Sequence, residues 1–202
     1  MVIPVYGKRV LMAYLATGFQ EADRDNSGRL ISCLGAIETN PFFSRVKEES
    51  YRLLHLQQGS RVLDVGCGTG SDVRRLTAFV GAGGMVVGVD PGISMLNEAV
   101  RAGSSSPTHE GGSASFIRMD GRHLAFPDSC FDGVREDRAL QHIGKPHEVI
   151  REMFRVLRPE GRFVFFEPDW ELFIIEVPER ELTRKILNCS ADSLMIGWIG
   201  RR

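Results

Sequence analysis

The stretch Arg61-Val-Leu-Asp-Val-Gly-Cys-Gly-Thr-Gly70 decides the fold of this chain. A short apolar run ends here in three glycines at alternate positions, and a helical pattern from Ser71 to Val80 follows directly. A strand, a glycine loop and a helix in this order bring a ligand close to backbone N–H groups. The glycines are needed where a Cβ would block the turn or the ligand. We therefore expect a cofactor-binding loop at this place.

The rest of the chain alternates strand and helix patterns around this loop. Further strands are expected at 85–90, 115–120, 131–135 and 162–167, and further helices at 93–102 and from Pro146 onward. Near-continuous apolar strands joined by helices indicate a parallel sheet covered on both faces. We predict an α/β, doubly wound, Rossmann-like core in residues 56–202, with residues 1–55 as an N-terminal helical cap.

Two acids and the glycine spacing bear on the kind of ligand. Asp64 lies inside the first strand, where a cationic ligand would benefit from a carboxylate and a dinucleotide pyrophosphate would not. The glycines follow G-x-G-x-G and not the dinucleotide pattern G-x-G-x-x-G. Asp90 ends the next strand, where an acid accepts hydrogen bonds from ribose hydroxyls, a feature shared with NAD sites. An NAD(P)-dependent reductase therefore stays open as the less favoured alternative.

Five ordered motifs resemble those of class I S-adenosylmethionine-dependent methyltransferases. They are Val62-Leu-Asp-Val-Gly-Cys-Gly-Thr-Gly70, Val87-Gly-Val-Asp90, Met119-Asp-Gly121, Phe131-Asp-Gly-Val134 and Arg155-Val-Leu-Arg-Pro-Glu-Gly-Arg162. The resemblance covers about residues 51–169, and the most similar group is that of the ubiquinone/menaquinone-biosynthesis-type, small-molecule methyltransferases. It implies S-adenosyl-L-methionine as cofactor and S-adenosyl-L-homocysteine as product. It leaves the acceptor, and its O, N, C or S atom, open.

The resemblance also implies which residues meet the methionine part of the cofactor. Asp64 and the backbone of Gly66 and Gly68 would lie against it. Glu136 stands where the family uses a backbone carbonyl to meet the methionine amine, and a role for its side chain stays open. The alternative for Asp64 is a purely structural acid that accepts from the loop amides.

The nucleoside part would be held further along the same edge. By the same resemblance, Asp90 takes the ribose hydroxyls and Pro91 lies beside the adenine. Asp120 accepts from the adenine amino group, and the amide of Gly121 meets the ring. Asp90 and Asp120 could instead be ordinary acids at strand ends.

Candidate groups for the chemistry follow the fourth and fifth strands. His142 is the best candidate for a general base, because an imidazole titrates near neutral pH, although a structural role is an open alternative. Arg138 is suited to a carboxylate on the cofactor or on an acidic acceptor, or to a salt bridge with Asp137. Glu167 and Trp170 are expected to line the acceptor pocket.

Composition gives the remaining expectations. Lys and Arg number 25 and Asp and Glu 26, for a net charge of -1, so a nucleic-acid partner is not expected. The four cysteines form no CxxC pair, so neither a metal site nor a disulfide framework is expected, and a cytoplasmic location fits. No apolar run approaches the ~20 residues that span a bilayer, so no membrane partner is expected.

The end of the chain departs from the family pattern. A helix is expected at 179–194, and the antiparallel hairpin that normally follows it in the family is missing. The fifth strand would then be an uncovered edge. A truncated chain, a naturally short member and an edge completed by a partner all fit, and we expect truncation. A homodimer through this edge is a further hypothesis, as is a truncated module that binds the cofactor without turnover.

Overall fold

The computed structural model describes residues 23, 27–104, 111–169, 172, 180–181, 183–185 and 188. The described part is built on a five-stranded sheet in the order β3-β2-β1-β4-β5, in which every neighbouring pair is parallel. Its strands are β1 (Arg61–Val65), β2 (Met85–Asp90), β3 (Ser113–Arg118), β4 (Phe131–Asp137) and β5 (Leu157–Phe166). The order reverses between β1 and β4, so the predicted doubly wound fold is confirmed.

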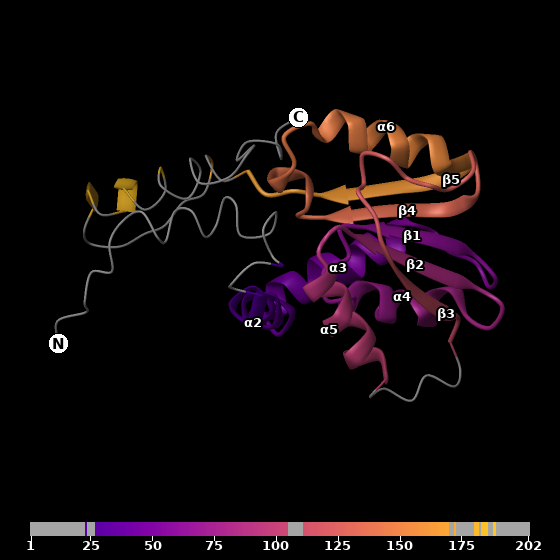
Figure 1. Cartoon of the computed structure of the whole chain (residues 1–202), viewed down its shortest axis with the longest axis horizontal. Helices are drawn as coiled ribbons and strands as arrows, with labels where there is room; N and C mark the ends of the chain where they lie inside the picture. Colours follow the sequence, from indigo (N-terminus) through magenta and orange to yellow (C-terminus); the bar gives the residue numbers. More distant parts are fainter. Residues whose placement is uncertain are drawn as a thin grey trace.

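Helices cover both faces of this sheet (Figure 1). They are α2 (Ser27–Glu38), α3 (Pro41–Leu53), α4 (Ser71–Val80), α5 (Ile93–Ser104) and α6 (Pro146–Val156), with a single 3-10 turn, η1 (Leu140–His142). The helices α3, α4 and α5 lie on one face, and α6 lies on the other.

Each face has its own apolar cluster, because the central strands β1, β2 and β4 are buried on both sides. Leu63 and Val134 of the sheet pack with Met153 of α6. On the opposite face, Val62 packs with Tyr51 of α3 and residues of α4. Tyr51, at 1% exposure, thus places α3 against the sheet in the same layer as α4.

Three strands differ from the sequence expectation, and the first is β4, which ends at Asp137 and not at the expected Arg135. β3 begins and ends two residues earlier than expected. β5 begins at Leu157, because the expected turn at 158–161 lies inside the strand as an irregularity: Phe131 pairs with Leu157, and Gly133 already pairs with Arg162. Most of the helix expected at 179–194 lies outside the described residues. Residues 1–22 of the expected cap lie wholly outside them.

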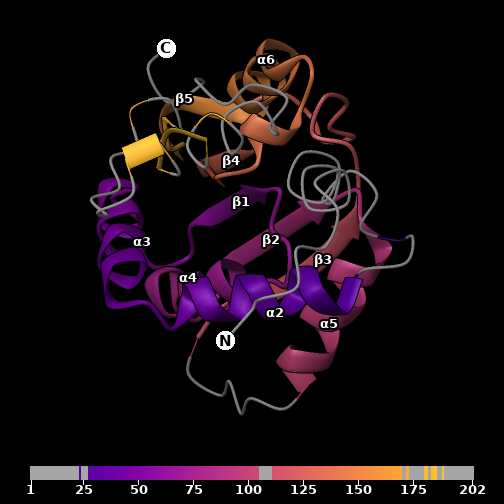
Figure 2. The same cartoon turned by 90° about the vertical axis from the view of Figure 1, so that its left-hand side faces the viewer.

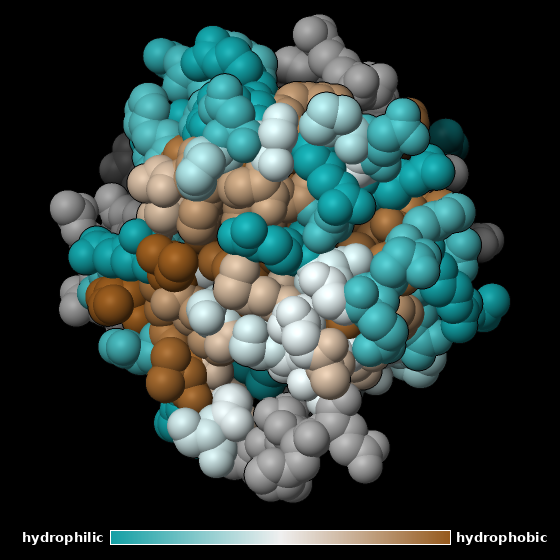
Figure 3. Space-filling model, turned by 90° about the vertical axis from the view of Figure 1, so that its right-hand side faces the viewer, coloured by the Kyte–Doolittle hydropathy of each residue, from teal (hydrophilic) through white to brown (hydrophobic). Residues whose placement is uncertain are grey.

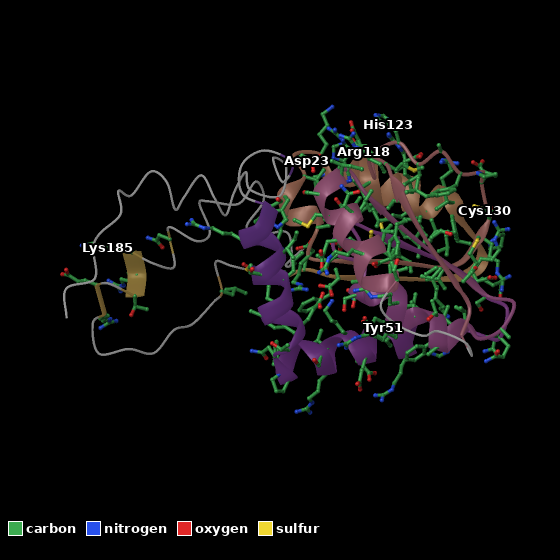
Figure 4. All side chains as sticks on the ribbon, turned by 60° about the horizontal axis from the view of Figure 1, so that its bottom comes forward. Asp23, Tyr51, Arg118, His123, Cys130 and Lys185 are labelled. Atoms are coloured by element: carbon green, nitrogen blue, oxygen red, sulfur yellow. The ribbon has the colours of Figure 1, made fainter. Side chains whose placement is uncertain are left out.

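Helix α2 lies across the carboxyl edge of the sheet, in front of α4 and α5 (Figure 2). Leu30 of α2 is 4% exposed and packs on Met95 of α5. Just before α2 in the chain, the Asp23 carboxylate accepts from the backbone N–H groups of Ile93 and Ser94, at 3.0 and 2.8 Å, and so caps α5. Figure 4 shows Asp23 beside Arg118, whose guanidinium is 3.8 Å away.

The opposite edge has a different surface. A hollow of about 450 Å³ opens at the amino ends of β1, β2 and β3, between Gly59, Arg61, Gly84 and Ser113. Figure 3 faces this side and shows polar side chains mixed with apolar ones. The glycine loop lies at the other end of the strands, so this hollow is separate from the candidate site. Within the described ranges we find no helix of the length and apolarity that crossing a membrane requires.

Candidate functional site

The glycine loop turns sharply at the end of β1. Gly66 and Gly68 have φ angles of 75° and 51°, a left-handed conformation that favours glycine. The N–H groups of Gly66 and Cys67 both donate to the Val89 carbonyl, at 2.8 and 3.0 Å, which ties the loop to β2. A side chain at Gly66 would overlap Ala139, whereas at Gly68 it would only touch Leu34 of α2, at 3.4 Å. Gly66 is therefore required by packing, and Gly68 faces the space under α2.

A small cavity lies in that space, between the loop, α2, α3 and the end of β4. Its volume is about 50 Å³, and its walls include Leu34, Lys47, Gly68, Asp72 and Arg138. Pockets that hold a drug-sized ligand usually measure about 300–1,000 Å³. This cavity by itself is therefore too small for a nucleoside cofactor.

A buried guanidinium organises the charges below the cavity. Arg135 of β4 is 1% exposed and contacts the carboxylates of Asp64, Asp72 and Asp137 at 2.9, 3.2 and 2.8 Å. Its Nε donates to the hydroxyl of Ser50 in α3, at 3.0 Å. Sequence reasoning missed Arg135, since nothing in a strand pattern distinguishes a buried arginine from one at the surface.

Asp64 points into this network. Burial raises the pKa of its carboxyl group to about 7, although Arg135 acts in the opposite direction. The carboxylate is bound to Arg135 beneath the loop and is not part of the cavity wall. A contact between Asp64 and the methionine part of a cofactor therefore stays a prediction.

Helix α3 adds the other half of the network. The Lys47 ammonium contacts Asp72, and Asp137 at 2.9 Å. The hydroxyl of Tyr51 also donates to Asp72. Burial alone would raise the pKa of Asp72, but Arg135 and Lys47 outweigh it and hold that pKa below its usual range.

Asp90 joins the glycine loop to the end of β2. Its Oδ2 accepts from the Gly68 N–H at 2.9 Å, and its Oδ1 accepts from the Gly92 N–H at 2.8 Å. Burial raises the pKa of this carboxyl group. Each oxygen keeps a second lone pair, which a ribose hydroxyl could use. Pro91 follows at the surface.

Asp120 and Gly121 follow β3 on the same edge. Both oxygens of Asp120 accept from the guanidinium of Arg122, at 2.6–3.1 Å, and these bonds lower the pKa of Asp120. Gly121 is buried, and a Cβ there would lie 2.9 Å from a methyl of Val65. Asp120 would have to share its carboxylate between Arg122 and an adenine.

Glu136 and Glu167 lie beneath η1, on the α6 face of the sheet. Glu136, at 0% exposure, accepts from the N–H groups of Ala139 and Leu140, and Glu167 accepts from the Gln141 N–H at 3.2 Å. Among the described residues, no donor reaches the buried Oε2 atom of either acid. Burial and mutual repulsion raise the pKa of Glu136 well above its usual value, and burial raises that of Glu167 to about 7. A single proton shared by the two carboxyl groups would satisfy both free oxygens.

Of the remaining candidates, Arg138 lines the cavity and His142 lies in η1. Burial, followed by the charge of Arg138, lowers the pKa of His142 to about 4, so its imidazole is neutral at pH 7 and a weak base. Arg138 has a φ of 60°, contacts Asp137 at 2.5 Å and stacks over the ring of Phe43 at 5.0 Å. Trp170 lies outside the described residues.

These groups fit a cofactor that carries both a zwitterionic amino acid and a nucleoside. Cations and carboxylates alternate around the glycine loop, and Asp90 and Asp120 end neighbouring strands on the same edge. A doubly wound sheet places its ligand at this edge, where the strand order reverses. The fold and the site thus define a Rossmann-like, cofactor-binding α/β protein.

Comparison with known families makes this more specific. Residues 63–165 match the model of a methyltransferase domain. The chain therefore belongs to the class I S-adenosylmethionine-dependent methyltransferases, as its motifs predicted.

Two curated proteins are similar to this chain over part of their length, and the second of them is named as a methyltransferase. The chain is 33% identical to a 37.1 kDa protein in transposon TN4556 of Streptomyces fradiae, over 85% of this chain and 49% of that protein. It is 37% identical to the ubiquinone/menaquinone biosynthesis C-methyltransferase UbiE of Pseudomonas paraeruginosa, over 60% of this chain and 46% of the relative. The chain thus spans about half the length of these relatives.

A solved structure shows the same fold. A SAM-dependent methyltransferase from Aquifex aeolicus superposes with a TM-score of 0.57 at 21% identity, over 79% of this chain and 86% of the other. At this identity the likeness supports the architecture and nothing finer.

Proposed function

We propose that this chain transfers a methyl group from S-adenosylmethionine to a small-molecule acceptor. The observation that carries the proposal is the glycine loop, which is tied to Asp90 and lies beside a wall of paired charges. The family match and the similarity to UbiE, a quinone-biosynthesis C-methyltransferase by its name, support a small acceptor. The near-neutral net charge fits the same substrate class.

The proposed cofactor contacts follow the carboxyl edge of the sheet. The methionine part lies over Gly66 and Gly68, with Asp64 and Glu136 supporting this region from below. The nucleoside part is held by Asp90, Pro91, Asp120 and Gly121. Movement of α2 away from Gly68 opens the site, and its return excludes water from the bound cofactor.

The chain's task in catalysis is mainly alignment. When bound, the cofactor would supply a methyl group activated by its sulfonium, which passes to an in-line nucleophile while S-adenosylhomocysteine leaves. Arg138 is placed to orient an acidic acceptor, and Glu167 and Trp170 are assigned to the acceptor pocket. His142 is the proposed proton acceptor for a nucleophile that must lose a proton, although the pKa of about 4 that burial gives its imidazole makes it a weak base.

Methyl transfer to extracted material tests this function. The chain is incubated with S-adenosylmethionine labelled on the methyl group and with separate small-molecule, protein and nucleic-acid fractions of a bacterial extract. We expect label in the small-molecule fraction. Label confined to protein or nucleic acid would contradict the proposed substrate class. Cofactor binding without transfer to any fraction would favour a binding module without turnover.

Assembly and location are proposed on separate grounds. A homodimer would cover the β5 edge, where Phe154 and Phe165 are 57% and 43% exposed. The cytoplasm is the proposed compartment, since the exposed Cys33 thiol would be open to oxidation elsewhere.

A further inference from the structure

Lys47 is a buried amine that neither the sequence motifs nor the family match includes. It lies on α3, ahead of the matched residues 63–165, and is 5% exposed. Its side chain forms part of the cavity wall beside Gly68, Thr69 and Ser71. Lysine is almost never buried unless it is paired, so its position requires an explanation.

The ion pairs of Lys47 do not by themselves explain it. Asp72 and Asp137 are its two acidic partners, and both also contact the guanidinium of Arg135, at 3.2 and 2.8 Å. Asp137 has a third cation in Arg138. Both carboxylates therefore keep a positive partner when Lys47 turns away from them.

The ammonium group also has donor capacity to spare. It carries three N–H donors, and within the described part of the chain two acceptors contact it. Arg138, the other cation of the wall, is more constrained, because it stacks on Phe43 while it contacts Asp137. A lysine on a flexible stem can reorient toward a ligand more easily than a stacked guanidinium.

We propose that Lys47 binds the carboxylate of the cofactor's methionyl group. The proposal rests on the proposed function and extends the cofactor site to α3. The cofactor's carboxylate supplies the third acceptor of the ammonium group, and Asp72 and Asp137 stay neutralised by Arg135. Helix α3 thereby links the cap side of the cavity to the glycine loop.

This contact is tested by measuring how tightly the wild type and one Lys47 variant each bind two ligands, one with the carboxylate and one without it. Calorimetry measures the affinity of the wild type and of Lys47→Met for S-adenosylhomocysteine and for its decarboxylated analogue, which lacks only the carboxylate. We expect Lys47→Met to weaken binding of S-adenosylhomocysteine about 10- to 100-fold, as for a lost charged hydrogen bond, and to leave binding of the analogue unchanged. Arg52→Met, on the exposed side of the same helix, is the matched control and should change neither affinity.

An unchanged affinity of Lys47→Met for S-adenosylhomocysteine overturns the proposal, and so do two further outcomes. Equal losses for both ligands would assign Lys47 a structural role, and a carboxylate-specific loss in Arg138→Gln but not in Lys47→Met would move the contact to Arg138. If Lys47→Met does not fold, Lys47→Gln, which retains a donor for Asp72, takes its place with the same expected results. Absence of S-adenosylhomocysteine binding to the wild type would instead defeat the proposed function itself.

Discussion

Two kinds of acid lie at the carboxyl edge of the sheet. Asp90 and Asp120 end neighbouring strands, and each has both carboxylate oxygens hydrogen-bonded. Glu136 and Glu167 are buried under η1, and each has one oxygen that no donor in the described part of the chain reaches. The first kind is suited to accept hydrogen bonds from a ligand, and the second kind responds to pH.

Asp90→Ala should weaken S-adenosylhomocysteine binding by about 1–3 kcal/mol, because the ribose hydroxyls and the Gly68 N–H both lose an acceptor. Calorimetric titration measures this change. Asp128→Ala, whose carboxylate lies at the surface beside Arg155, is the control and should bind as the wild type does. An unchanged affinity in Asp90→Ala would refute the ribose contact.

Glu167 should make the fold less stable as the pH rises. Its pKa is about 7 in the folded chain against an ordinary value of 4.5 for a glutamate, so between these two values the folded state binds more protons than the unfolded state. The free energy of unfolding therefore falls as pH rises through that window and levels off above it. Asp64, also raised to about 7, adds a slope of the same sign.

Urea unfolding of the wild type and Glu167→Gln between pH 5 and 8 isolates this effect. The wild type should lose on the order of 1 kcal/mol more than the variant across this range. Equal slopes in the two proteins would contradict a shared proton between Glu136 and Glu167.

Single residues also mark the limit of sequence reasoning. The pattern located Asp64, Asp90 and Asp120 on one edge, since parallel strands end together. It did not reveal that Asp64 pairs with Arg135, or that Lys47 pairs with Asp72 and Asp137. Those pairings join residues far apart in the chain, and only the packing of α3 on the sheet brings them together.

At the scale of elements, helix boundaries were the most predictable feature. Pro146 begins α6 and Gly81 ends α4, as turn chemistry indicates. The start of β5 was not predictable, because the Arg158–Gly161 turn is absorbed inside the strand against β4. The position of α2 over the glycine loop was also not predictable from the sequence. An amphipathic pattern predicts that a helix has an apolar face, but it does not predict which element that face packs against.

Helix α2 should limit the rate of cofactor entry. Leu34 reaches to contact distance of Gly68, and the cavity beneath measures only about 50 Å³. Leu34→Ala should raise the association rate constant of S-adenosylhomocysteine several-fold, measured by stopped-flow fluorescence. Cys33→Ala, on the exposed side of α2, should leave it unchanged. A rate constant unaffected by Leu34→Ala would mean that α2 does not gate the site.

At the scale of the whole molecule, β5 is an edge strand of the described sheet. The ring of Phe163 in β5 lies 4.8 Å from that of Phe154 in α6 and 5.5 Å from that of Phe165 in β5. A long apolar edge favours pairing with another chain.

Light scattering at high concentration should therefore detect a dimer, and Phe165→Lys should shift it to a monomer. A wild-type monomer at every concentration would contradict the homodimer hypothesis.

The predicted division into a cap at 1–55 and a core at 56–202 stays a prediction.

Calorimetric titration of the 202-residue chain with S-adenosylmethionine, S-adenosylhomocysteine and NADH tests the central claim most directly. We predict micromolar binding of the first two ligands and no binding of NADH, because the glycine loop lies beside Lys47 and Asp72 and lacks the dinucleotide spacing. Binding of NADH alone would contradict the assignment of the cofactor. Binding of none, with the circular dichroism of a folded α/β protein, would contradict the interpretation of this edge as a cofactor site.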